Sequence, residues 1–197
     1  MPEVRTIAVI GAGPGGREIA RAAAQAGYRT LLEDILPSSL RGAQDEIRRR
    51  LEQAVESGRS SRNDADAALA RIEYVGTIEE AARGADLVIE AVPDEMESKL
   101  EIFLLLDKMC RPGTILVSNT ATLSITEIAS TTWRPAQVLG MRFGGPAQPD
   151  RRLEIVRGRQ TDDPTLAAVV EVGRRMGREV EVVADQPSQP SQPAPRA

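Results

Sequence analysis

The chain has 197 residues, of which 41% are hydrophobic and 27% are charged, which predicts one globular domain with its own core. Its net charge of −4 argues against nucleic-acid binding, and its one cysteine, Cys110, excludes an internal disulfide framework. No apolar run approaches the roughly 20 residues of a membrane span, so we expect a cytoplasmic protein without nucleic-acid or membrane partners.

The chain contains no histidine. The commonest near-neutral general acid or base is therefore absent, and so is any Ser-His or Cys-His dyad. Because there is also only one cysteine, we predict no metal site.

The elements expected in the first half of the chain alternate between strands and helices. Residues 6–10 form an apolar strand, 17–26 a helix and 28–32 a second strand. Two consecutive helices follow, over 38–57 and about 63–70, the second capped by Asn63 or Asp64. We then expect a strand at 72–75, a short helix at 78–83 capped by Thr77, and a buried strand at 86–92.

The second half continues the alternation. The expected elements are a helix at 97–109, strands at 114–118, 137–141, 153–156 and 179–183, helices at 124–130 and 163–176, and a Gly- and Pro-rich loop at 144–149. This order predicts an α/β Rossmann fold, a doubly wound and mostly parallel sheet with a helical excursion after its second strand. Residues 1–184 are expected to fold and 185–197, rich in Pro, Gln and Ser, to form a disordered tail.

A glycine-rich turn joins the first strand to the first helix. Gly11, Gly13 and Gly16 complete a G-x-G-x-x-G pattern, with Pro14 and Gly15 between them. The first glycine permits a tight turn, the second admits a pyrophosphate to the helix N-terminus, and the third lets helix and strand pack closely. A turn without a ligand is the alternative, but the flanking strand and helix favour a dinucleotide site.

An acidic residue at the end of the second strand supports the same interpretation. Asp34 is the better placed, with Glu33 beside it, to accept hydrogen bonds from the adenosine ribose. A carboxylate there repels a 2′-phosphate, so we predict NAD rather than NADP as the cofactor of residues 1–184.

Five motifs occur in an order and spacing that resemble the NAD-binding domain of the 3-hydroxyacyl-CoA dehydrogenase family. They are DLVIEAV (86–92), ESK (97–99), SNTATL (118–123), GMRF (140–143) and LEIV (153–156). The resemblance covers about residues 4–183. It implies that Ala91, Val92 and Asn119 lie at the cofactor, and that Lys99 contacts the ribose on the nicotinamide side.

The departures from the family pattern fall on its chemistry. The family's catalytic histidine is Arg142 here, its serine is Ala121 and its asparagine is Gly145, whereas the glutamate that orients the histidine is retained as Glu154. Arginine stays protonated at neutral pH and cannot act as the base. The family's helical substrate domain is not matched after Asp185.

Two interpretations of Arg142 remain open. It either forms a structural ion pair with Glu154, or binds an anion or a carbonyl. We name Arg142, Glu154 and Asn119 as candidate catalytic residues. The favoured function is an NAD(H)-dependent oxidoreductase acting on a hydroxy or carbonyl substrate, anionic or an acyl-CoA, within a homodimer. The alternatives are a non-catalytic NAD-binding partner protein and an enzyme without redox chemistry.

Overall fold

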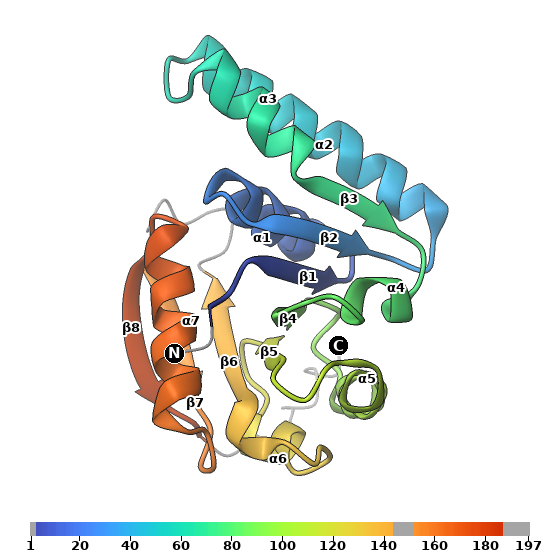
Figure 1. Cartoon of the computed structure of the whole chain (residues 1–197), viewed down its shortest axis with the longest axis vertical. Helices are drawn as coiled ribbons and strands as arrows, with labels where there is room; N and C mark the ends of the chain where they lie inside the picture. The colour runs from blue at the N-terminus through green and yellow to red at the C-terminus, as the bar shows by residue number, and fades with distance from the viewer. Residues whose placement is uncertain (1–2, 144–151, 187–197) are drawn as a thin grey trace, which may run out of the picture.

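The computed structural model describes residues 3–143 and 152–186. A single eight-stranded sheet with the order β3-β2-β1-β4-β5-β6-β7-β8 organises them (Figure 1). The strands are β1 (Thr6–Ile10), β2 (Arg29–Glu33), β3 (Ile72–Val75), β4 (Leu87–Glu90), β5 (Ile115–Asn119), β6 (Val138–Phe143), β7 (Arg152–Arg157) and β8 (Glu179–Ala184).

The pairing of the strands confirms the predicted fold class. All neighbours are parallel except β6 and β7, which pair antiparallel, with Arg142 opposite Glu154. The strands in the middle of the sheet are buried on both faces, as the continuous apolar runs of a parallel sheet require. Each strand lies within a few residues of its predicted position.

Helices cover both faces of the sheet. They are α1 (Pro14–Gln25), α2 (Pro37–Glu56), α3 (Arg62–Ala70), α4 (Ile78–Ala82), α5 (Met96–Met109), α6 (Ile125–Ala129) and α7 (Asp163–Arg175), with a 3₁₀ turn at Pro135–Gln137 that was not predicted.

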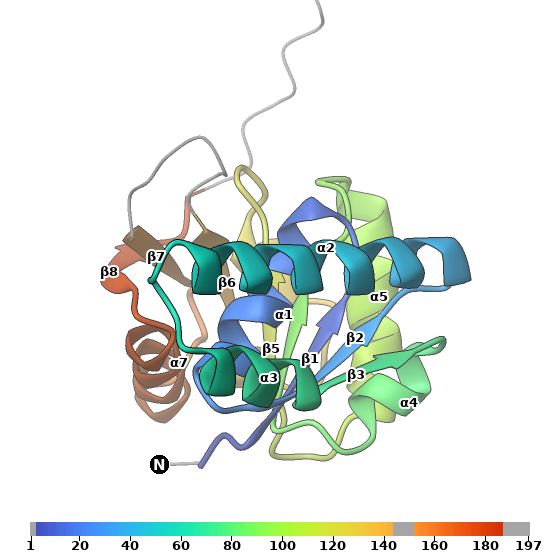
Figure 2. The same ribbon diagram turned by 90° about the horizontal axis from the view of Figure 1, so that it is seen from above.

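The helical excursion forms as predicted, because α2 and α3 run antiparallel and pack against α1 (Figure 2). The N-cap of α3 differs from the prediction. The hydroxyl of Ser61, rather than Asn63 or Asp64, accepts the backbone N–H of Asp64 at 3.0 Å, and it donates to the Asp64 carboxylate. The predicted cap at Thr77 is confirmed by its bond from the N–H of Glu80.

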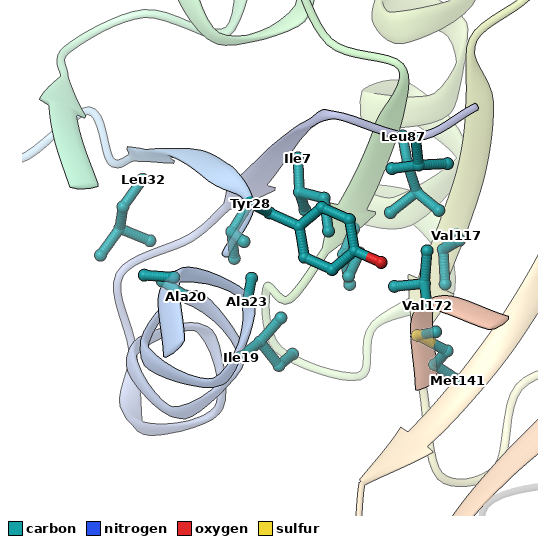
Figure 3. Close-up of a cluster of buried hydrophobic side chains, with 14 of the residues drawn as sticks. Ile7, Ile19, Ala20, Ala23, Tyr28, Leu32, Leu87, Val117, Met141 and Val172 are labelled. Atoms are coloured by element: carbon teal, nitrogen blue, oxygen red, sulfur yellow. The ribbon is translucent and has the colours of Figure 1, made fainter. Parts of the chain in front are cut away.

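Two apolar clusters lie on opposite faces of the sheet. Figure 3 shows part of the larger one, in which Tyr28 packs beside side chains of α1 and of the central strands. Tyr28 is almost fully buried, so it serves as a packing residue of this cluster. Successive side chains of a strand point to opposite faces of the sheet, so neighbouring residues of each strand belong to different clusters.

Asp185, one residue beyond the predicted end of the folded part, is hydrogen-bonded to the start of α6, while the division of the chain after residue 184 stays a prediction. Its carboxylate accepts hydrogen bonds from Ser124 Oγ at 2.9 Å and from the backbone N–H groups of Ile125 and Thr126 at 3.0 and 2.8 Å. The end of β8 is thereby attached to the start of α6. The predicted loop at 144–149 and the rest of the tail, from 187 to 197, lie outside the described residues.

We expect Asp185→Ala to lower the free energy of unfolding at neutral pH by about 1 kcal/mol, the usual effect of removing a helix cap. Burial acts to raise the pKa of Asp185, but hydrogen bonds from Thr126, Ile125 and Ser124 outweigh it and hold the pKa below its ordinary value of 3.8. The stabilisation is therefore complete above about pH 5 and is lost as the pH falls through the lowered pKa.

Urea unfolding of the wild type and of Asp185→Ala between about pH 7 and pH 3 measures this difference, which should shrink at the acid end. The exposed Asp66→Ala serves as the control. An Asp185→Ala protein as stable as the wild type at pH 7 would contradict the assignment of Asp185 to the fold.

Candidate functional site

The candidate site lies at the carboxyl ends of β1, β4 and β5, where the order of strand connection reverses between β1 and β4. Ligands of doubly wound sheets bind at such a reversal, in the crevice outside the strand ends. The glycine turn, the ends of β2 and β4 and the loop after β5 meet there.

The three glycines of the turn meet different steric demands. Gly11 has a φ of +101°, which favours glycine, and a Cβ on Gly16 would lie 1.8 Å from the Gly11 carbonyl oxygen. A Cβ on Gly13 would meet no described atom within 4 Å. Gly16 is therefore required for packing, whereas Gly13 leaves an open approach to the backbone.

The N-terminus of α1 is suited to bind a pyrophosphate. Gly13 is its N-cap and supplies no side-chain hydrogen bond, and Pro14 begins the helix. Backbone N–H groups of the first turn point out of the helix end, whose dipole attracts an anion. Gly15 lies beside Asn119, because a Cβ on Gly15 would be 3.4 Å from the Asn119 amide nitrogen.

Asp34 attaches the glycine turn to the start of α2. Its two carboxylate oxygens accept the backbone N–H groups of Ala12 and Leu36, both at 2.9 Å. A carboxylate retains further acceptor sites after these two bonds, so the arrangement is compatible with the predicted contact to a ribose hydroxyl.

Beside Asp34 opens a pocket of about 520 Å³, which adjoins the glycine turn. We call it the adenosine pocket, after the part of a dinucleotide that the end of β2 receives. Its lining includes Gly11, Glu33, Asp34, Ile35, Ile78, Glu79, Val92, Ile102 and Met109.

A buried ion pair lies beneath the edge of β4 and β5. Lys99 Nζ donates to both carboxylate oxygens of Glu90, at 2.7 and 2.9 Å, and both side chains are 0% exposed. Ser118 Oγ donates to the same carboxylate at 2.7 Å. Burial raises the pKa of Glu90, while the Lys99 ammonium acts to lower it.

The ammonium group of Lys99 also reaches two backbone carbonyls of the site, those of Val92 at 3.2 Å and Asn119 at 3.3 Å. All of these partners belong to the protein, and the side chain has no exposed surface. The predicted contact of Lys99 with the cofactor ribose therefore stays a prediction; what the structure shows is a lysine that holds two loops.

Glu90 and Ser118 were missed as site residues by the sequence analysis. The only signal was a glutamate inside the apolar run 86–92, because a buried carboxylate requires a partner.

Ala91, Val92 and Asn119 come together with the glycine turn. A Cβ on Gly11 would lie 3.1 Å from the carbonyl oxygen of Ala91 and 3.3 Å from Val92 Cγ1. The structure thus brings together the predicted cofactor residues of the turn, of β4 and of β5 at one edge, while the fully buried Lys99 lies behind them.

Arg142 and Glu154 form an ion pair across β6 and β7. Arg142 Nη1 lies 3.3 Å from Glu154 Oε2, and Arg142 Nε donates to the Thr120 carbonyl at 3.3 Å. The ion pair, one of the two interpretations left open by the sequence, is present, whereas a role of Arg142 in binding an anion stays a hypothesis. Ala121 is anchored by its N–H to Asp94 Oδ2 at 2.9 Å, whereas Gly145 lies outside the described residues.

The family model for the 3-hydroxyacyl-CoA dehydrogenase NAD-binding domain matches residues 6–186. The chain belongs to this family. A probable 3-hydroxybutyryl-CoA dehydrogenase of Bacillus subtilis is 37% identical to it, over 94% of this chain and 64% of that protein. The 3-hydroxyadipyl-CoA dehydrogenase of Escherichia coli is 36% identical, over 91% of this chain and 38% of its own length.

A solved structure, the (S)-3-hydroxybutyryl-CoA dehydrogenase of Ralstonia eutropha, superimposes with a TM-score of 0.90 at 30% identity, covering 94% of this chain and 65% of that one. The chain thus spans less than two thirds of these relatives. The matching family model describes an NAD-binding domain, and the uncapped α1 terminus and the approach at Gly13 fit that cofactor.

Within residues 3–143 and 152–186, no cluster of three or more potential metal ligands occurs. In the same part of the chain, no helix is long and apolar enough to cross a membrane.

We expect Lys99→Met to destabilise the protein by about 3–5 kcal/mol, because it leaves the Glu90 carboxylate buried without its cation. Adding Glu90→Gln should recover much of this loss, since it removes the unpaired charge. Chemical denaturation gives both values. Lys108→Met, at the exposed second lysine, is the matched control. If the Lys99→Met protein were as stable as the Lys108→Met protein, the result would contradict the buried pair.

Proposed function

We propose that this chain binds NAD(H) at the glycine turn and serves as the cofactor-binding half of an oxidoreductase for a hydroxy or carbonyl substrate. The observation that carries the proposal is the open N-terminus of α1, where Gly13 leaves room for a pyrophosphate beside Asn119. The names of the three relatives given above, each a hydroxyacyl-CoA dehydrogenase, support the reaction type.

When bound, the cofactor supplies the hydride that such a reaction transfers. The protein must then orient the substrate and stabilise charge on its oxygen. Asn119 is positioned by its backbone bond to Lys99, and Arg142 is held by Glu154 and Thr120.

Arg142 is suited to bind charge rather than to move a proton. Its side chain is about a quarter exposed, and within the described residues its Nη2 donates to no protein acceptor. A guanidinium group with a free edge binds a carboxylate or a polarised carbonyl oxygen. We therefore propose an anionic oxo or hydroxy acid as the substrate class, with the proton delivered by water.

A non-catalytic NAD-binding protein is the second candidate. The ion pair between Arg142 and Glu154 favours it, because the pair preserves the local geometry without requiring a substrate. The two candidates share the cofactor site and differ only in what Arg142 does.

A titration of NADH, followed by its fluorescence, tests the cofactor site. We expect Gly13→Ala to weaken NADH binding at least tenfold, because the added methyl group occupies the approach to the helix terminus. Its stability should be unchanged, since that methyl group meets no protein atom. Gly84→Ala, which also has open space, is the control. Failure of the wild type to bind millimolar NADH would contradict both candidates.

Steady-state assays with NADH separate the candidates. We expect little or no reduction of acetoacetyl-CoA, because the carbonyl oxygen must gain a proton, general-acid catalysis of that step contributes about 10²–10⁴-fold, and arginine does not provide it. Small 2- and 3-oxo acids should be reduced, and Arg142→Met should abolish that activity while changing NADH affinity by less than about twofold. Reduction of acetoacetyl-CoA as fast as by a full-length relative would show that our interpretation of Arg142 is wrong.

A further inference from the structure

Glu33 is a carboxyl group that the proposed function leaves without a role. It is the last residue of β2, it is only 5% exposed, and it lines the adenosine pocket. Because side chains alternate along a strand, Glu33 shares the face of Leu31, which packs in the smaller apolar cluster, with α4 and α5.

The neighbours of Glu33 are mostly apolar. On the sheet, Ile10 of β1 and Val75 of β3 lie opposite it in register. Across the pocket, α4 contributes Ile78, and α5 contributes Ile102 and Met109. A carboxylate in such surroundings loses hydration that these side chains cannot replace.

Few charged or polar groups face Glu33. Asp34 follows it in the chain, and the N–H of Gly11, which donates to the backbone carbonyl of Glu33 at 2.9 Å, also acts on the carboxyl group. From α4, Glu79 lines the same pocket, but its charge is balanced by an ion pair with Arg83. Among the described residues that line the pocket, none is a lysine or an arginine.

We propose that the Glu33 carboxyl contacts the adenosine part of the dinucleotide directly and is protonated in the complex, so that binding takes up a proton. This rests on the proposed NAD(H) site. A ligand that fills the pocket excludes the remaining water from Glu33, which disfavours its charged form beside Asp34. The proton comes from the solvent, and the resulting O–H donates to an acceptor on the adenine or ribose.

The titration behaviour of the free protein agrees with this geometry. Burial, and then the charge of Asp34, raise the pKa of Glu33 to about 7, although the N–H of Gly11 opposes the shift. Near neutral pH, about half of the molecules already carry the proton. Because the complex holds the protonated form, NADH affinity should be constant below about pH 6 and should fall as the pH rises through about 7.

Isothermal titration calorimetry with NADH tests the proposal in buffers of different ionisation enthalpy at about pH 8. The wild type should take up close to one proton, and its affinity should fall roughly 20-fold between about pH 6.5 and pH 8.5. Glu33→Gln, which mimics the neutral carboxyl, should bind without proton uptake and with little pH dependence. Glu80→Gln, on the exposed side of the same helix as Glu79, should behave as the wild type.

An infrared difference spectrum gives a second readout. The carbonyl band of a protonated carboxyl group should appear when NADH binds to the wild type and should be absent from Glu33→Gln. NADH binding without proton uptake, or uptake that persists in Glu33→Gln, would overturn this inference and leave the proposed function intact. No NADH binding at any pH would overturn both.

Discussion

The fully buried contact between Lys99 and Glu90 determines the shape of the whole cofactor edge. It joins α5 to the end of β4, and through Ser118 and the carbonyl of Asn119 it includes the end of β5. Such a pair is a weak source of net stability, because both ions lose their hydration. Its structural consequence is specific: two loops that flank the glycine turn are attached to one ammonium group.

That fixed edge allows the glycine turn to serve two purposes. The close approach of Gly16 to the carbonyl of Gly11 sets the direction in which α1 leaves β1, and the open space at Gly13 leaves its N-terminus accessible. The glycine that packing requires and the glycine that leaves the helix terminus open are thus different residues, only three positions apart. The backbone bonds of Asp34 then align the start of α2 with the same turn.

Arg142 and Glu154 form a pair of opposite charges at the ends of β6 and β7. Arg142 and Glu154 face each other because β6 and β7 are antiparallel, so the contact follows from strand register. An ion pair with a permanent cation cannot exchange a proton near neutral pH, but it can present a fixed positive charge to a ligand. The proposed anion-binding group and the proposed dinucleotide site would then lie along the same edge of the sheet.

The fold class, the helical excursion and the glycine turn were all predictable from the sequence, because apolar periodicity and glycine spacing are local properties of the chain. Motifs that resemble a family suggested the pairing of Arg142 with Glu154 as one of two alternatives, and the strand register shows the two residues opposite each other. Three features depended on tertiary structure: the burial of Lys99, the attachment of Asp185 to α6, and the apolar surroundings of Glu33. Each involves neighbours distant along the chain, and the environment of a charged side chain is decided by those neighbours rather than by its own segment.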